Sequence, residues 1–265
     1  MVNKMRMLYR YIKHGDVGNG VLAFCGLDSS NTYKCIICGD MVNRFYPYGV
    51  KDDFFSSHHV VGGGYRANCI CLHCGCIDRT RWQYYTIKNH TDILTEQCEV
   101  LHIAPEKGIM SKITDNTSCK YYSGDIRPGA ADHIVDLTNM TDIQDDCFDY
   151  VIVNHVMEHI PDEGRAFSEI HRVLKQGGKL VLSFPICMDQ DTFEVEDIDT
   201  DEKRLANYGQ KDHHRLYGRD YKERVESFGF RVEVFTPEKE LSDEYIEKYG
   251  FIRNDIIMIC TVVKQ

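Results

Sequence analysis

FDYVIVNHVMEHIPDEGRAFSEIHRVLKQGGKLVLSFP, residues 148–185, is the stretch that decides the fold. It opens with the apolar run FDYVIVN, which ends at Asn154 and predicts a buried β-strand. EGRAFSEIHRVLK follows with apolar residues at helical spacing, and we expect Gly177–Gly178 to end this helix. KLVLSFPI then predicts a second strand. A strand, a helix and a further strand in this order are typical of a parallel sheet covered by helices.

The same alternation continues over the chain from about residue 98. Further strands are expected in CEVLHIA, CKYYSGD, HIVDLTNM, FRVEVFT and DIIMICTVV, and further helices in EKGIMSKI and DYKERVESFG. The fold class is therefore α/β. Such sheets bind ligands beyond the carboxyl ends of their strands. Polar residues recur at those ends: Glu106, Asp125, Asp136, Asn154 and His155.

Residues 154–163, NHVMEHIPDE, also contain H-x-x-E-H, a pattern of zinc peptidases in which two histidines bind the metal. Pro161 follows His159 by two residues and limits any helix here to little more than one turn. A zinc peptidase needs a sustained helix and a third ligand, and the sequence offers no convincing third ligand. We therefore expect no zinc at His155 and His159, and interpret Glu158 and His159 as a pair that holds the turn.

Composition bounds the class of protein. The chain has 265 residues, 43% of them hydrophobic, and a net charge of −10. This suffices for one large domain, or a medium domain with a small appendage. The acidic balance disfavours binding along nucleic acid. The first 15 residues lack the features of a signal peptide, and no apolar run could span a bilayer. We expect a soluble, cytoplasmic protein without a membrane partner.

Cysteines concentrate near the front of the chain. Six of the twelve fall between Cys35 and Cys76. KCIICGD and CLHCGC form two C-x-x-C-G knuckles, which predict a closed structural zinc site with four thiolates. The predicted zinc ligands are Cys35, Cys38, Cys71 and Cys74. The knuckles are widely spaced, and Cys69, His73 and Cys76 are further candidate ligands; the alternative is four reduced thiols without metal. We expect residues 1–90 to form this lobe and residues 91–265 the second domain.

Residues 148–185 resemble the strand-4 to strand-5 segment of class I S-adenosylmethionine (SAM)-dependent methyltransferases. The front end is similar to a subgroup with two such knuckles, an Arg-x-Arg after the second (Arg79 and Arg81 here) and a strand that reads LHxAPE. The resemblance implies a Rossmann-like, seven-stranded, mostly parallel sheet whose last strand is antiparallel. It also implies SAM as the cofactor.

The first loop departs from this family. A glycine-rich G-x-G-x-G usually follows strand 1, to let the backbone approach SAM closely. Here the segment is HIAPEKG, with Ala104, Pro105, Glu106 and Gly108 as the expected cofactor loop. Glu106 is expected either to bind the cofactor's ammonium group or to act only as a carboxylate at a helix start.

The other cofactor contacts follow from the resemblance. Asp125 should accept both ribose hydroxyls, although a turn aspartate is the alternative. Asp136 and Leu137 should meet the adenine. Asn154 and His155 should line the methionine chain or the transfer region, and the alternative for His155 is a satisfied core histidine.

Residues 209–221, GQKDHHRLYGRDY, form a second polar cluster that also resembles the subgroup. Methylation of a hydroxyl requires an aligned nucleophile and a group that removes its proton. We expect His213 to be the general base, with His155 or His159 as the competitor, and Asp212 and Tyr217 to contribute. Arg215 is expected to clamp a carboxylate or phosphate. The alternative is a solvated, charged lid without a chemical role.

The predicted function is SAM-dependent methyl transfer to a small molecule or sugar, at oxygen. One alternative is N-methylation, or methylation of a protein or RNA delivered by the zinc lobe. Another, from a different class, is a non-catalytic zinc-knuckle interaction protein. The sequence identifies neither the acceptor nor the oligomeric state.

Overall fold

The computed structural model describes residues 2–25, 32–51 and 53–264, and the chain divides into two compact units. Unit 1 comprises residues 1–51, 65–86 and 236–255. Unit 2 comprises residues 52–64, 87–235 and 256–265. Residues 236–255 thus group with the front of the chain, whereas they were expected in the second domain. The two-domain division at residue 90 stays a prediction.

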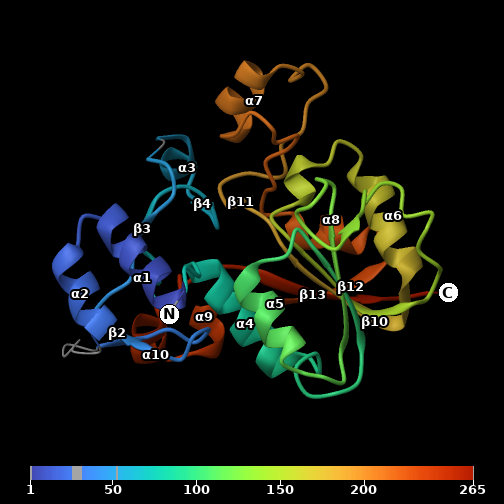
Figure 1. Cartoon of the computed structure of the whole chain (residues 1–265). Coiled ribbons are helices and arrows are strands. Elements are labelled where there is room, and N and C mark those ends of the chain that lie inside the picture. The colour runs from blue at the N-terminus through green and yellow to red at the C-terminus, as the bar shows by residue number, and fades with distance from the viewer. Residues whose placement is uncertain (1, 26–31, 52, 265) are drawn as a thin grey trace. The chain divides into compact units, whose positions relative to one another are not determined.

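Among the described residues, unit 2 contains a seven-stranded sheet in the order β12-β13-β10-β9-β6-β7-β8 (Figure 1). Its strands are β6 (Glu99–Ile103), β7 (Lys120–Asp125), β8 (His133–Ile134), β9 (Phe148–Asn154), β10 (Leu174–Ser183), β12 (Phe230–Phe235) and β13 (Ile257–Val262). Strands β6 to β10 pair in parallel. β13 runs antiparallel to both its neighbours, β10 and β12. This topology confirms the predicted Rossmann-like α/β fold with an antiparallel last strand.

Helices cover both faces of this sheet. Its helices are α5 (Lys107–Thr114), α6 (Glu163–Val173) and α8 (Tyr221–Glu226). Figure 1 shows α5 and α6 on opposite faces. Phe167 and Ile170 of α6 are fully buried in the main apolar core, as are Val151 and Val153 of β9. Burial on both faces explains why these strands are nearly continuous apolar runs.

The α6 helix ends earlier than the sequence predicts. Asp162 caps its start, because its carboxylate accepts a hydrogen bond from the Arg165 amide at 2.9 Å. The helix stops at Val173, since Leu174 is extended and pairs with Phe148 of β9. Gly177 therefore lies inside β10, where the ladder is interrupted, and the expectation that Gly177–Gly178 end the helix is wrong. Strand pairing, which is not local, overrides the local glycine signal.

Unit 2 also contains several shorter elements. They are α3 (Asp53–Ser57), β4 (Val60–Val61), the 3₁₀ helix η1 (Met157–His159), β11 (Ile186–Cys187) and α7 (Asp201–Tyr208). β4 and β11 pair antiparallel, and so tie residues 60–61 to the segment that follows β10. Thr200 caps α7, and Gly209 ends it with a left-handed backbone.

Unit 1 consists of helices and short hairpin strands. Its elements are α1 (Val2–Lys13), α2 (Val17–Cys25), β1 (Tyr33–Lys34), β2 (Met41–Val42), β3 (Tyr46–Tyr48), β5 (Arg66–Ile70), α9 (Pro237–Glu240), α10 (Asp243–Tyr249) and the first part of α4 (Asp78–His90). The fully buried Arg81 donates to the carbonyls of Cys69, Tyr249 and Gly250. This one side chain links residues 236–255 to the cysteine-rich segment.

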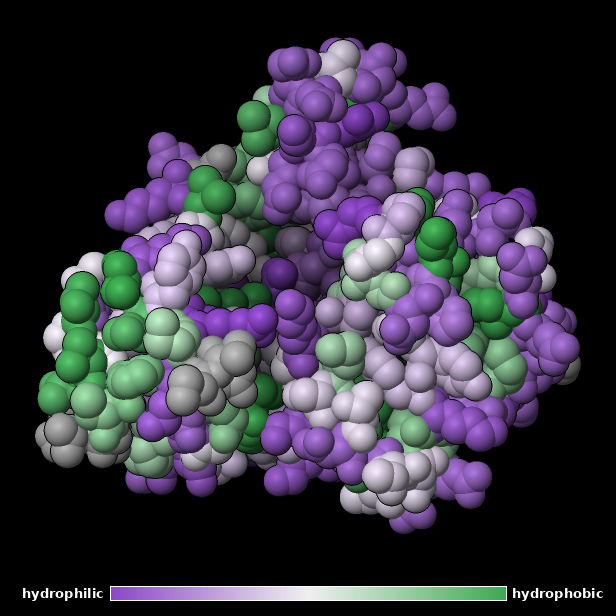
Figure 2. All heavy atoms as spheres, in the orientation of Figure 1, coloured by the Kyte–Doolittle hydropathy of each residue, from purple (hydrophilic) through white to green (hydrophobic). Residues whose placement is uncertain are grey.

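The α1 and α2 pair carries an exposed apolar surface (Figure 2). Its exposed apolar side chains are Met5, Ile12, Val17, Val21 and Leu22. Within residues 2–25, 32–51 and 53–264, none of the helices has both the length and the apolar character that crossing a bilayer requires.

Candidate active site

The carboxyl ends of three neighbouring strands place polar side chains along one edge of the unit 2 sheet. β6 lies between β7 and β9, with Ile103 beside Gly124 on one side and beside Val153 on the other. Asp125 and Asn154 are the next residues of β7 and β9. They therefore lie at the same edge, on either side of the end of β6, which is where α/β sheets bind ligands.

Two residues at this edge have left-handed backbones although neither is glycine. Ala104 (φ 48°) follows β6, and His155 (φ 51°) follows β9. The Ala104 amide donates to the Gly124 carbonyl at 2.7 Å, and the His155 amide to the Ser183 carbonyl at 2.8 Å. The left-handed region costs a non-glycine residue about 1–2 kcal/mol. Such conformations cluster at functional sites. Ala104 thus adopts a backbone that suits glycine, in the loop where glycines were expected.

The loop after Ala104 leads directly into α5. Pro105 and Glu106 precede the helix, and Gly108 lies in its first turn. The Glu106 side chain caps none of the helix amides; its carboxylate lies 2.9 Å from Nε2 of the buried His102. Glu106 therefore has a partner that the sequence did not suggest, and its contact with the ammonium group of SAM stays a prediction.

Asp125 carries a buried carboxylate at the end of β7. Its Oδ1 accepts hydrogen bonds from the Arg127 amide at 2.8 Å and from Arg127 Nε at 3.1 Å. Arg127 Nη2 donates to Oδ2 at 3.0 Å. These hydrogen bonds lower the pKa of Asp125, so the carboxylate is ionised at neutral pH. The Arg127 side chain is 76% exposed. The site therefore offers an anionic acceptor whose present partner, Arg127, lies largely in solvent.

Asp136 and Leu137 follow β8, and their side chains have opposite environments. Asp136 is exposed, and its Oδ1 accepts from the amide and the hydroxyl of Thr138 at 2.8 and 2.7 Å. Leu137 is buried in the main core. The predicted adenine contacts of both residues stay a prediction.

Asn154 has a buried polar atom that lacks a partner. Its Oδ1 accepts a hydrogen bond from the Ser183 hydroxyl at 3.0 Å. Among the described residues, its Nδ2 has no hydrogen-bond partner although it is buried. An unsatisfied buried donor costs about 1–3 kcal/mol. A ligand with an acceptor atom at this edge would remove that cost.

The H-x-x-E-H segment forms a tight turn and not a sustained helix. Met157–His159 is a single 3₁₀ turn, as the position of Pro161 predicted. Glu158 is buried, and its Oε1 lies 3.4 Å from His155 Nδ1 and 4.0 Å from His159 Nε2. The predicted pairing of Glu158 with His159 is thus only part of a contact that also includes His155.

The 209–217 segment places His213 beside this turn. The His159 and His213 rings meet edge to face, with centroids 4.7 Å apart. The His214 amide donates to the Glu158 carbonyl at 2.8 Å. Burial and the neighbouring His159 lower the pKa of His213 to about 4, so the ring is neutral at pH 7. His213 lies far from Glu158 and His159 in the sequence, so no motif spacing connects them. This is why the sequence did not reveal His213 as a third side chain at this turn.

Arg215 is fully buried, and it donates hydrogen bonds to backbone carbonyls of the same turn. Its Nη1 donates to the carbonyls of Met157 at 2.8 Å and Ile160 at 2.6 Å. Its Nη2 donates to the Pro161 carbonyl at 2.9 Å and to Glu194 Oε1 at 2.7 Å. The guanidinium is thus engaged by the protein, and its predicted role as a clamp for a carboxylate or phosphate stays a prediction.

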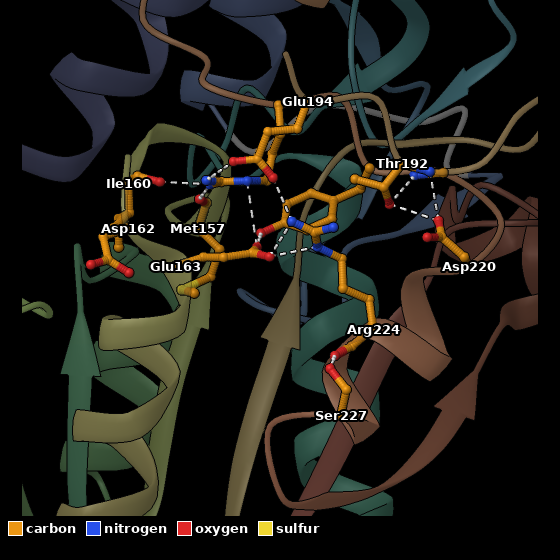
Figure 3. A network of polar contacts seen from close by, with 12 residues as sticks. Met157, Ile160, Asp162, Glu163, Thr192, Glu194, Asp220, Arg224 and Ser227 are labelled. Carbon is orange, nitrogen blue, oxygen red and sulfur yellow. Dashed lines mark hydrogen bonds and ion pairs between the residues drawn. The ribbon is translucent and has the colours of Figure 1, made fainter. Parts of the chain in front are cut away.

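Tyr217 is also fully buried and hydrogen-bonded within the protein. Its hydroxyl donates to Glu163 Oε2 at 2.6 Å, and its ring stacks on Phe184 at a centroid distance of 3.6 Å. Arg224 forms ion pairs with the carboxylates of both Glu163 and Glu194 at 2.5 Å (Figure 3). The Tyr217 hydroxyl thus faces a buried carboxylate, and its predicted catalytic role stays a prediction. Asp212 is largely exposed, and both its carbonyl and its carboxylate lie close to His159 Nδ1.

In unit 1 the two cysteine knuckles have the same backbone geometry. The Gly39 amide donates to the Cys35 carbonyl at 2.8 Å, and the Gly75 amide to the Cys71 carbonyl at 2.7 Å. Both glycines have left-handed backbones, φ 80° and 83°.

The thiols of Cys35, Cys38, Cys71 and Cys74 all lie within 4.8 Å of one another. Cys35 and Cys74 sulfurs are 3.7 Å apart. This matches the edge of about 3.8 Å expected for tetrahedral zinc thiolates. Cys76 Sγ lies 3.3 Å from Cys35 Sγ, so this further candidate ligand also adjoins the cluster.

Comparison with known proteins agrees with this picture of unit 2. Residues 101–182 match a family model described as a methyltransferase domain. A search of curated proteins found no match. The matched residues include the strand ends of the candidate site from Ala104 to Asn154. They support a SAM-dependent methyltransferase, the enzyme class that the sequence predicts.

Several solved structures are also similar. A SAM-dependent methyltransferase from Archaeoglobus fulgidus is 16% identical, with 69% of this chain and 94% of that chain covered and a TM-score of 0.44. Phosphoethanolamine N-methyltransferase 2 from Haemonchus contortus, in complex with SAM, is 16% identical over 69% of this chain and 52% of that chain, with a TM-score of 0.46. The [4+2]-cyclase SpnF is 13% identical over 70% of this chain and 81% of that chain, with a TM-score of 0.48.

Proposed function

We propose that the chain transfers a methyl group from SAM to a hydroxyl group of a small molecule or sugar. Asp125 would accept the ribose hydroxyls, and Asp136 with Leu137 would meet the adenine. The loop from Ala104 to Gly108 would approach the methionine part. SAM, when bound, supplies the methyl group as a sulfonium substituent.

Two observations at the sheet edge fit such a ligand. The Asn154 Nδ2 is a buried donor without a partner among the described residues, and suits the acceptor atoms of the methionine part. The Asp125 carboxylate is ionised. Asp125 is the last residue of β7 and directly follows Gly124, which pairs with Ile103 at the end of β6. A carboxylate can accept two hydrogen bonds at once, as paired ribose hydroxyls require.

The observation that favours an oxygen acceptor is the Nε2 atom of His213. The His213 residue is 1% exposed, and within the described part of the chain this nitrogen has no hydrogen-bond partner. A neutral imidazole with an available lone pair suits a general base. A hydroxyl must lose its proton when its oxygen bonds to the methyl carbon, and His213 Nε2 would take that proton. Ser183 and Glu158 would hold Asn154 and the turn in place.

The experiment is incubation of the full chain with methyl-labelled SAM and a panel of phenols, monosaccharides and matched primary amines. We expect label in methyl ethers of one hydroxyl class, and a much lower yield with His213→Gln. Label found only on amines would contradict the oxygen acceptor. An absence of SAM binding by calorimetry would contradict the proposed function as a whole.

We also propose that Cys35, Cys38, Cys71 and Cys74 hold a structural zinc ion. The matching knuckle turns and the sulfur separation support this assignment. Four thiolates complete a tetrahedral shell and leave no position for a substrate. The metal would stabilise a lobe, proposed at residues 1–90, that has few regular strands of its own.

A further inference from the structure

We propose that Glu158, His159 and His213 bind a divalent transition-metal ion. Within the described residues, one donor atom from each of these side chains lies within 4.8 Å of the other two. Glu158 and His159 come from the turn after β9, and His213 comes from the segment after α7. Two imidazole nitrogens and one carboxylate oxygen are a ligand set typical of zinc, manganese and iron sites.

Each imidazole is held in place by a hydrogen bond at the ring nitrogen that does not face the cluster. His159 Nδ1 lies 3.2 Å from the Asp212 carbonyl and 3.3 Å from the Asp212 carboxylate. Its Nε2 is thereby turned toward Glu158, at 4.0 Å. The His213 ring has a hydrogen bond to the Tyr208 backbone, which leaves Nε2 for the cluster. Metal-binding histidines are characteristically held through the second nitrogen in this way.

The buried lone pair of His213 is the second, independent observation. The residue is 1% exposed, and its Nε2 has no hydrogen-bond partner among the residues that the structure describes. An orphaned acceptor inside a protein costs free energy that a bound cation would recover. Arg215 supports the site without entering it, because its donors hold the carbonyls of the turn.

The role of this metal rests on the proposed function, whereas its binding does not. Three protein ligands leave a coordination position for the acceptor hydroxyl. Coordination to the cation lowers the pKa of that hydroxyl. Its proton then passes to solvent, and the oxygen uses the electron pair that it keeps to form the bond to the methyl carbon. The bond between that carbon and the sulfur of SAM breaks, and its electron pair returns to the sulfur, which leaves as a neutral thioether. The Nε2 lone pair serves one partner at a time, so His213 is a ligand in the metal-bound chain and a base only in the metal-free chain.

Manganese(II) is the probe that separates this site from the cysteines, because Mn²⁺ prefers oxygen and nitrogen ligands over thiolates. The full chain is titrated with Mn²⁺ at pH 7.5, and free Mn²⁺ is measured by electron paramagnetic resonance. We expect one Mn²⁺ per chain, with affinity reduced by about tenfold or more in His213→Ala and His159→Gln. His159 is partly exposed, so its variant should fold. His133→Ala, at an exposed position on β8, is the matched control and should bind as the wild type does.

Equal Mn²⁺ binding by the wild type, His213→Ala and His159→Gln would overturn the site, as would no Mn²⁺ binding by the folded wild type. Metal analysis after growth with zinc provides a second readout: two zinc ions per wild-type chain and one in His159→Gln support it, and equal numbers contradict it. Methyl transfer that resists chelators would overturn the metal's role and leave the proposed function intact. Mn²⁺ binding without SAM binding would support the metal site and contradict the proposed function.

Discussion

The imidazole of His213 lies edge-on to that of His159, with an interplanar angle of 82°. The contact joins the H-x-x-E-H turn after β9 to a segment about fifty residues later in the chain. It puts two nitrogen ligands and the buried Glu158 carboxylate in one place, next to the carboxyl edge of a Rossmann-like sheet. The chemistry that we propose depends on this convergence.

His213→Gln should lower kcat with little change in the affinity for SAM. Glutamine keeps much of the side-chain volume but provides no imidazole lone pair. Loss of a general base typically costs about 10²–10⁴ in rate. The turnover of the best labelled acceptor and the calorimetric Kd for SAM are measured on both proteins. A variant with full turnover would show that His213 has no part in activating the acceptor.

Arg215→Ala should destabilise the fold. Its removal leaves three carbonyls of the turn and the Glu163 and Glu194 carboxylates without their buried cation. Breaking such a buried network costs about 3–5 kcal/mol. Urea unfolding measures the loss.

Arg219→Ala is the matched control for this measurement. Arg219 forms an exposed pair with Asp191 at 2.7 Å. Its removal should cost about 1 kcal/mol or less. If Arg215→Ala were as stable as wild type and lost only acceptor affinity, the result would contradict the structural role and favour the predicted anion clamp.

The thiol-bound zinc should respond to cysteine chemistry separately from the histidine site. Cys71→Ser should reduce the zinc content by one ion per chain and lower the unfolding temperature, because the metal contributes folding free energy. Cys25→Ser, at an exposed position outside the knuckles, should change neither quantity. Unchanged zinc content in Cys71→Ser would contradict the four-cysteine assignment.

The sheet could be predicted because its signals are local. FDYVIVN is apolar since β9 is buried on both faces, and Asn154 marks the strand end because polar side chains occur where the strand reaches the edge. The end of α6 could not be predicted from Gly177, because Leu174 leaves the helix to pair with Phe148. A glycine signal is visible in the sequence, whereas a strand partner twenty-six residues away is not.

The sequence predicted which residues lie at the strand ends, but not which side chains the fold brings into contact. Asp125 and Asn154 lie where the resemblance placed them, at strand ends. Arg215 has the residue type of an anion clamp, but its burial against the carbonyls of Met157 and Ile160 depends on tertiary packing. The grouping of Glu158 and His159 with His213 likewise follows from the fold and from no spacing in the chain.

The most direct test of the central claim is calorimetric titration of the wild type, Asp125→Ala and Asp115→Ala with SAM. Asp115 is an exposed residue at the end of α5 and serves as the control. Asp125→Ala removes hydrogen bonds to a charged group, worth about 1.5–3 kcal/mol each. We expect saturable binding by the wild type and Asp115→Ala, and at least about a hundredfold weaker binding by a folded Asp125→Ala. Equal affinity in all three proteins, or no binding by the wild type, would contradict a SAM site at this edge of the sheet.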